Sequence, residues 1–317
     1  MKRLIDNLND YLNRLAQGGY RYIKAKTYPG SKVKDVTLMT FDPRNSGTMI
    51  PLPHGEYRYK DTGKVYKRRR RKSRTSNKSS IYRTRRILSG LILSNFYGEK
   101  NELLITLTYK ASNKLSCEDK EDTERSSRDI QNYFLSLRRF LEKVGVNLNN
   151  FKYLWVREPN EDGSFHFHAL VKLVSAKTIN SKIQEAFKFK WKWGMVDIRP
   201  LEEANLHVER YFMPTVTDLK TTPKNPKAEM KENASRQTKA DIKGERLKRY
   251  PHNSKIYGRS KNLNRPTIKR GKMEDFEFSD QAEVIKSETK IVLTGDVSFP
   301  ITYVRFEDRD ILRKIRE

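Results

Sequence analysis

The stretch YLWVREPNEDGSFHFHALVKLV, residues 153–174, decides the fold. Two runs rich in apolar, β-branched and aromatic residues flank a polar, glycine-containing segment, PNEDGS at 159–164, which is the pattern of two strands joined by a turn. The stretch therefore predicts an antiparallel hairpin. Because side chains of a strand alternate between its faces, His166 and His168 point the same way and Phe167 points the other way.

This hairpin also predicts a metal site. Two imidazoles on one strand face lie about 7 Å apart at Cα and can share a divalent ion. Glu158 ends the first strand, and the turn brings it beside the two histidines. One carboxylate with two imidazoles leaves coordination positions open, which suits Mg²⁺ or Mn²⁺ engaging a phosphate oxygen. The alternative is a pair of surface histidines beside a solvent-facing carboxylate.

The other elements follow from periodicity. Apolar spacing of three and four residues predicts a strong helix over 130–144, closed by Gly145. Weaker patterns predict further helices at 4–15, 86–97, 179–191 and 202–220, and strands at 103–109, 194–201, 290–295 and 301–306. The order predicts the α+β class, with a central antiparallel sheet that carries helices on one face and a basic N-terminal extension. The pattern over residues 16–80 and 270–317 predicts no reliable fold.

The charge balance points to a nucleic-acid partner. The 317 residues include 66 Lys and Arg against 39 Asp and Glu, a formal net charge of +27. A field of that sign attracts polyanions and is typical of nucleic-acid binders. The densest run, between Lys60 and Arg86, is expected to be disordered until phosphate neutralises it. Within it Arg68, Arg69, Arg70 and Arg71 are candidate DNA contacts, the alternative being a solvated basic segment.

Cysteine usage and hydropathy bound the compartment. The single cysteine, Cys117, excludes an internal disulfide and a cysteine-based zinc cluster, and it fits a reducing cytoplasm. The first fifteen residues lack the apolar core of a signal peptide, and no run approaches the ~20 apolar residues of a membrane span. We therefore expect a cytoplasmic protein of a bacterial host, encoded by a mobile element, with no membrane partner.

Tyr211 is the candidate nucleophile. It lies on the predicted helix NLHVERYFMPTVTDLK, residues 205–220, after the histidine strand. A phenol attacks phosphorus when it is held in line and a metal withdraws charge from the phosphate. Since the chain has 16 tyrosines, position rather than residue type favours Tyr211, and Tyr250 and Tyr257 are fallbacks. His207 could replace the carboxylate as a ligand or tune the phenol, although a surface histidine is its ordinary interpretation.

Residues from about 102 to 265 resemble the HUH endonucleases, specifically the rolling-circle replication initiators of plasmids and phages. The resemblance rests on three motifs in sequence order, LLITLTYK at 103–110, FHFHAL at 165–170 and VERYFMPT at 208–215. It implies a metal-dependent, site-specific DNA endonuclease and strand transferase. Tyr211 would form a 5′-phosphotyrosine at the origin and free a 3′-OH primer. The first motif would lie beside the site, where Thr106 and Thr108 contact DNA.

Two positions depart from the family pattern. Pro214 stands where many initiators carry a lysine, and Thr215 stands where a second tyrosine would. The resemblance therefore implies a single-tyrosine enzyme, with Lys220 the one substitute for the lysine further along. Because no G-x-x-x-x-G-K-[ST] motif occurs, unwinding falls to a host helicase, and a host polymerase extends the primer.

We expect three regions along the chain. They are a basic, partly disordered N-terminal extension at 1–80, an HUH nicking domain at 81–270, and a C-terminal extension of unassigned role at 271–317. Two alternative functions stay open at this point. One is a single-tyrosine HUH transposase with the same chemistry, and the other is a basic nucleic-acid-binding protein without activity.

Overall fold

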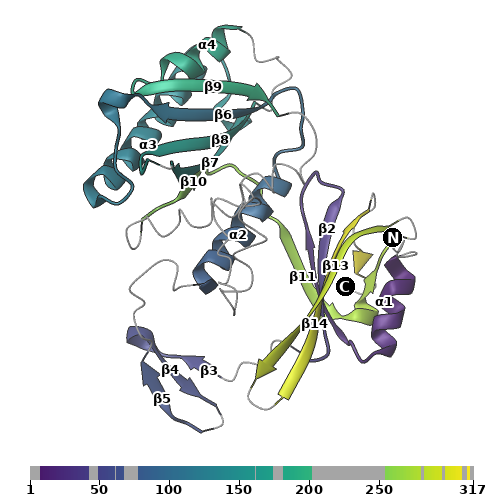
Figure 1. Ribbon diagram of the computed structural model, residues 1–317. Coiled ribbons are helices and arrows are strands. Elements are labelled where there is room, and N and C mark those ends of the chain that lie inside the picture. Colours follow the sequence, from purple (N-terminus) through teal and green to yellow (C-terminus); the bar gives the residue numbers. More distant parts are fainter. Residues whose placement is uncertain are drawn as a thin grey trace, which may run out of the picture. The chain divides into compact units, whose positions relative to one another are not determined.

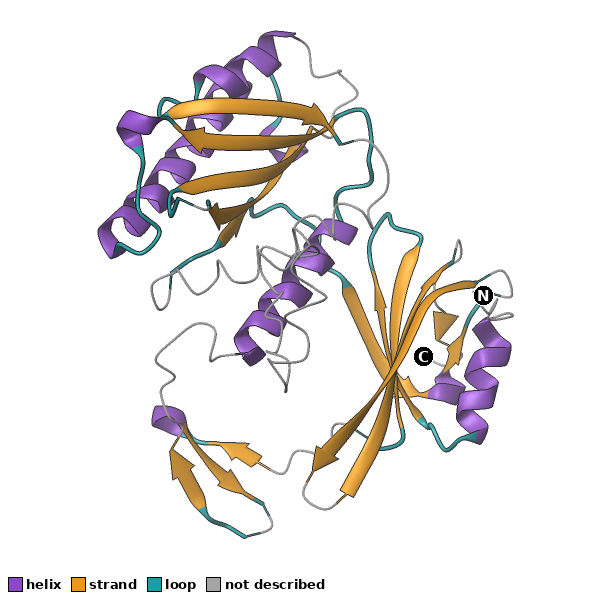
Figure 2. Ribbon diagram, in the orientation of Figure 1, coloured by secondary structure: helices purple, strands orange, loops and turns teal. Residues whose placement is uncertain are grey.

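The computed structural model describes residues 8–42, 49–60, 62–67, 78–160, 162–173, 181–201, 254–279, 282–294, 297–308 and 313–314. The chain divides into two compact units (Figures 1 and 2), unit 1 with residues 1–70 and 265–317 and unit 2 with residues 71–264. No helix within these described ranges is long and apolar enough to cross a bilayer. The helix expected at 202–220 lies outside them.

Unit 2 is built on a five-stranded antiparallel sheet of order β10-β7-β8-β6-β9 (Figure 1). Its strands are β6 (Glu102–Tyr109), β7 (Phe151–Pro159), β8 (Phe165–Leu173), β9 (Gly194–Pro200) and β10 (Tyr257–Arg259). Its helices are α2 (Lys78–Leu93), α3 (Lys120–Lys143) and α4 (Ser181–Phe189), with short 3-10 turns η2 (Ala111–Asn113) and η3 (Leu148–Asn150). The α+β class and the hairpin predicted from the sequence are confirmed.

One face of this sheet, here called the helix face, packs against α3 and α4. Phe134 of α3 stacks on Tyr153 of β7 with ring centroids 3.9 Å apart, and the Tyr133 hydroxyl donates to the Phe187 carbonyl oxygen at 3.0 Å. Trp155 and Trp191 are buried here, as expected of core aromatics. Aromatic contacts of this kind hold the sheet and helices in one rigid layer pair.

The opposite face, here called the site face, is covered only at one end in the described part of unit 2. There Lys152 donates to the Asn95 side chain at 3.2 Å, and the Glu102 carboxylate accepts from the backbone N–H of Tyr97 at 2.7 Å. The end of α2 and the residues after it therefore lie on this face. The expectation of helices on one face only was wrong, because apolar side chains of α2 join the same core, among them Leu88, Leu91 and Ile92.

Two helix starts differ from the sequence prediction. α2 begins at Lys78, inside the segment expected to be disordered, because three buried side chains at its far end anchor a helix that its own charges oppose. α3 begins at Lys120, in what was predicted to be loop, and Asp119 caps it by accepting from the Asp122 N–H. Packing and capping, rather than apolar periodicity, set both starts.

Unit 1 is a second antiparallel sheet, of order β11-β1-β2-β14-β13, covered on one face by a helix. Its elements are α1 (Leu8–Gln17), β1 (Tyr22–Thr27), β2 (Val33–Met39), β11 (Thr267–Lys272), β13 (Glu283–Thr294) and β14 (Val297–Glu307). Smaller pieces are β3 (Met49–Pro51), η1 (Pro53–Gly55), β4 (Glu56–Tyr59), β5 (Val65–Lys67), η5 (Met273–Asp275), β12 (Phe276–Glu277) and β15 (Arg313–Lys314).

The strands of unit 1 come from both ends of the chain. β1 and β2 from the N-terminal region pair with β11 and β14 from the C-terminal region. The two strands expected at 290–295 and 301–306 are present within β13 and β14. Local patterns could not show this sheet, since its partners lie more than two hundred residues apart in the sequence.

Candidate metal centre

The β7–β8 turn fixes the register of the hairpin. Gly163 adopts a left-handed φ of 78°, which glycine reaches without a steric penalty. Asp162 accepts from the Ser164 backbone N–H at 2.9 Å, and a hydrogen bond from Lys114 holds the pKa of the Asp162 carboxyl below its usual range. The closed turn places Glu158 directly opposite His166.

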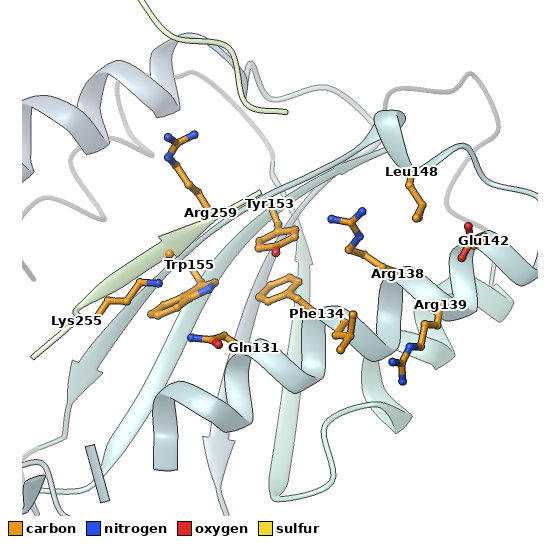
Figure 3. Close-up of a pocket in the computed structure, with 12 residues that line it drawn as sticks. Gln131, Phe134, Arg138, Arg139, Glu142, Leu148, Tyr153, Trp155, Lys255 and Arg259 are labelled. Carbon is orange, nitrogen blue, oxygen red and sulfur yellow. The ribbon is translucent and has the colours of Figure 1, made fainter. Parts of the chain in front are cut away.

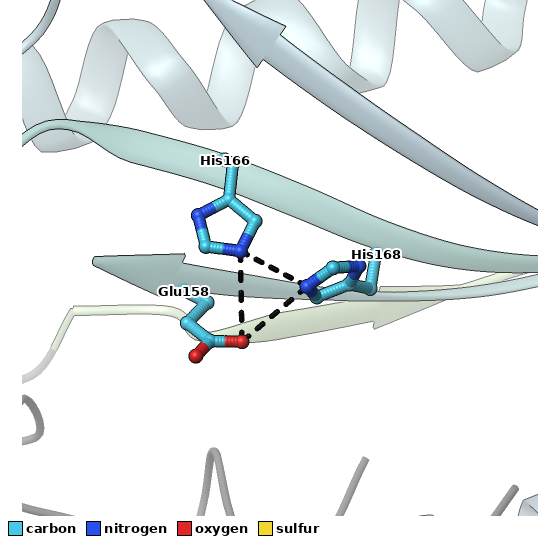
Figure 4. Close-up of side chains that lie close together, drawn as sticks. All are labelled: Glu158, His166 and His168. Atoms are coloured by element: carbon cyan, nitrogen blue, oxygen red, sulfur yellow. Dashed lines mark hydrogen bonds and ion pairs between the residues drawn. The ribbon is translucent and has the colours of Figure 1, made fainter. Parts of the chain in front are cut away.

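The three predicted ligands meet on the site face (Figure 4). Nε2 of His166 and Nε2 of His168 lie 2.9 Å apart. Oε2 of Glu158 lies 3.6 Å from the first nitrogen and 3.4 Å from the second. The Glu158 side chain is 1% exposed and those of the two histidines about a tenth, so the cluster is an almost closed polar site at the sheet surface.

These separations fit a shared ion. A triangle with those three sides has a circumradius of about 1.9 Å, so a point about 2.1 Å from all three atoms exists just above its plane, which matches ordinary metal–nitrogen and metal–oxygen bonds. Two imidazole nitrogens at 2.9 Å also need a proton or a cation between them. Within the described ranges, this is the group of acidic and histidine ligands close enough to hold a metal ion.

Neighbouring strands support the histidines. The Thr106 hydroxyl on β6 lies 3.2 Å from Nδ1 of His168, and a hydrogen bond at that nitrogen selects which ring nitrogen carries the proton and orients the ring. The register pairs Thr108 with His166. Both threonines therefore lie beside the cluster, where the sequence placed their motif.

Tyr257 shares the site face with the cluster. It pairs with Val156 on β7, which in turn pairs with His168 on β8. At the usual strand spacing its backbone lies about 10 Å from that of His168. Of the three tyrosines considered as nucleophiles, the structure describes this one, while Tyr211 and Tyr250 lie outside the described residues. So do His207, Lys220, Arg68, Arg69, Arg70 and Arg71.

A buried arginine directly behind Glu158 stiffens the strand, and sequence reasoning missed it. Arg157 is fully buried on the helix face, and its guanidinium donates to the Thr123 carbonyl at 2.7 Å and the Ser126 hydroxyl at 2.6 Å on α3. It also donates to the Lys255 carbonyl at 2.6 Å, just before β10. One cation thus ties three elements together beneath the metal cluster. The signal available was an arginine inside an apolar strand, VRE.

The helix face also carries a groove that the sequence did not predict (Figure 3). It has a volume of about 550 Å³ and lies between α3, β7 and β10. Its lining includes Arg138, Arg139, Lys255 and Arg259 against one acid, Glu142. The groove contacts the reverse of the strand that holds Glu158, so it is a separate feature from the metal cluster.

The comparison with protein families identifies one match. Residues 102–216 match a family model described as a replication-associated protein of the ORF2 type. The matched range, roughly a third of the chain, begins at β6 and contains Glu158, His166 and His168. It also contains position 211. No curated protein and no solved structure matches the chain.

Proposed function

We propose that this protein is a rolling-circle replication initiator, which nicks and rejoins DNA at an origin through a covalent 5′-phosphotyrosine. The observation that carries the proposal is the convergence of one buried carboxylate and two imidazoles within 3.6 Å. The match of the same segment to a replication-associated family supports DNA as the substrate. The net charge of +27 favours the same partner.

Glu158, His166 and His168 would hold Mg²⁺ or Mn²⁺, which when bound polarises a phosphate oxygen and stabilises charge on the reacting phosphoryl group. The protein's own part is positioning. Thr106 fixes the His168 ring, Arg157 holds the strand from behind, and the closed turn sets Glu158 opposite His166. A prearranged set of this kind costs little reorganisation when the substrate arrives.

Tyr211 is the proposed nucleophile. Its oxygen forms a bond to the scissile phosphorus while the bond to the 3′ oxygen breaks, the phenol loses its proton, and the leaving oxygen gains one. The energy of the broken ester bond is kept in the phosphotyrosine, so attack by a 3′-OH rejoins the strand. The 3′-OH released in the first step primes a host polymerase, and a host helicase unwinds the duplex.

A nicking assay on supercoiled plasmid carrying the origin tests this proposal. We expect nicked circles with Mn²⁺, none with EDTA, and none from Tyr211→Phe. Tyr257→Phe is the matched control, because it removes the same hydroxyl from a tyrosine on the site face. Nicking that persists in EDTA, or that Tyr257→Phe abolishes while Tyr211→Phe does not, would overturn the assignment. Origin DNA, rather than transposon ends, as the preferred substrate separates an initiator from a single-tyrosine transposase.

A further inference from the structure

The sheet of unit 1 has one face that no core packing explains. Directly paired residues of antiparallel strands point to the same side, so the register defines this face, here called the basic face. It consists of three cross-strand rows, Lys272–Tyr22–Met39–Ile301–Lys290, Arg270–Lys24–Thr37–Tyr303–Glu288 and Ile268–Lys26–Asp35–Arg305–Lys286.

The opposite face accounts for the fold of unit 1. Side chains from β1, β2 and β14 on that side are buried against α1 in one apolar cluster, including Ile23, Leu38, Phe306, Leu8 and Leu12. The Tyr11 hydroxyl of α1 also contacts the Ser287 hydroxyl of β13 at 2.6 Å. The hydrophobic stabilisation of unit 1 therefore comes from one side of its sheet, and the basic face is left for another role.

The charges of the basic face are unbalanced. It carries seven basic and two acidic side chains. The acids are already engaged, since Asp35 accepts from Arg305 at 2.7 Å and Glu288 from Lys290 at 3.2 Å. A net positive field therefore covers all five strands, and it attracts a polyanion.

The register also places like charges directly opposite one another. Lys24 pairs with Arg270, and Arg305 pairs with Lys286. Such cross-strand pairs destabilise a sheet that stands alone. Their presence on a face without a structural task is understandable if a bound polyanion offsets the repulsion.

An exposed aromatic ring completes the pattern. Tyr303 lies in the middle row, is 42% exposed, and has the Lys290 ammonium 5.8 Å from its ring centroid. Tyr22, in an adjacent row, is half-buried. Cations that contact phosphates and rings that stack on unpaired bases are the combination found in single-strand-binding surfaces.

We propose that the basic face of unit 1 binds a single strand of DNA, with phosphates on Lys24, Arg270 and their neighbours and a base stacked on Tyr303. A sheet face offers neither a helix nor a ribbon to the major groove, and stacking requires unpaired bases, so a single strand fits better than a duplex. The site goes beyond the proposed nicking function, since it needs neither the metal cluster nor Tyr211.

The test measures binding of the full chain to a fluorescent oligonucleotide, single-stranded or duplex, in EDTA over a series of salt concentrations. Lys24→Ala with Arg270→Ala is expected to weaken single-strand binding about tenfold and to reduce the salt slope by about 1.4. Because the double variant removes a like-charged pair, its thermal midpoint without DNA should not fall. Equal affinity of the variant and the wild type at every salt concentration would overturn the proposal.

Lys269→Ala is the matched control for position. Lys269 is exposed on the same strand as Arg270, but it pairs with Ala25 and points to the opposite face. We expect it to change affinity less than twofold, roughly what a phosphate-free lysine contributes. A loss equal to that of Arg270→Ala would show general charge attraction and overturn the assigned face.

Tyr303 tests the stacking part. Tyr303→Ala should weaken single-strand binding by about fivefold or more and leave duplex binding unchanged, while Tyr303→Phe should bind as the wild type does. Equal losses for single-stranded and duplex DNA would refute stacking. Tyr211→Phe should leave all these affinities unchanged, so failure of the nicking proposal and failure of this one are distinguishable.

Discussion

The two faces of strand β8 have been put to different uses. Phe165 and Phe167 point to the helix face, where both are fully buried and Phe167 contacts Trp155 and Trp191 edge-on with centroids 5.8 Å away. His166 and His168, which alternate with them, face Glu158 instead. One strand thus anchors the core with every second residue and presents a polar cluster with the others.

This difference shows why a metal site can be held so closely on a sheet. The aromatic side of β8 is packed so densely that the strand cannot slide, and a slip of one residue would exchange the two faces. The rigidity of the helix face is therefore the means by which the imidazoles keep their spacing. Mutations on the two faces should fail in different ways.

The largest effect is expected for the cluster itself. Glu158→Gln and His168→Ala should each reduce nicking by more than about a thousandfold and abolish Mn²⁺ binding seen by electron paramagnetic resonance, with the thermal midpoint near that of the wild type. The control is Asp197→Asn, which changes an exposed carboxylate on the same face. If either cluster variant binds Mn²⁺ as tightly as the wild type does, the metal assignment is wrong.

The converse is expected on the helix face. Phe167→Ala leaves a cavity in the aromatic core and should lower the free energy of unfolding by about 3–5 kcal/mol, measured by urea denaturation. At low temperature the folded fraction should still bind Mn²⁺. Phe189→Ala, at a side chain 78% exposed on α4, should change stability by less than about 0.5 kcal/mol. Loss of the metal site without loss of stability in Phe167→Ala would contradict the division between the faces.

A smaller effect is expected where a neighbouring strand orients an imidazole. Thr106→Val keeps the shape of the side chain but removes the hydroxyl beside Nδ1 of His168. We expect metal affinity to fall about tenfold, in the range found for groups that orient ligands, and titration calorimetry with Mn²⁺ measures it. Thr106→Ser retains the hydroxyl and should restore affinity. An unchanged affinity in Thr106→Val would remove this residue from the account.

The smallest effect concerns a carboxyl on the helix face. Asp129 is buried and accepts from the Tyr109 hydroxyl at 2.9 Å, and burial raises the pKa of Asp129 above its usual 3.8. A raised pKa means that stability falls as pH rises through it, because the folded state then carries a buried charge. Asp129→Asn keeps an acceptor and does not ionise. Its stability relative to the wild type should therefore increase with pH above 3.8, as followed by thermal melts; a decrease would show that the ionised form is favoured.

The site hairpin could be predicted from sequence because its information is local. Alternation fixed the directions of His166 and Phe167, and a six-residue turn fixed Glu158 opposite the first histidine. Arg157 could not be predicted, since its partners lie on α3 and before β10, and only the packed structure brings them together. The sheet of unit 1 was hidden for the same reason, because pairs such as Tyr22 with Lys272 join opposite ends of the chain.

The most direct test of the central claim is to trap the covalent intermediate. The full chain is incubated with Mn²⁺ and a library of single-stranded DNA, denatured and digested, and mass spectrometry maps the modified residue and the attached nucleotide. The account predicts one adduct, on Tyr211 through a 5′-phosphate, that disappears in EDTA and in Glu158→Gln. An adduct on Tyr257 or Tyr250, or nicked DNA with no protein attached, would contradict it.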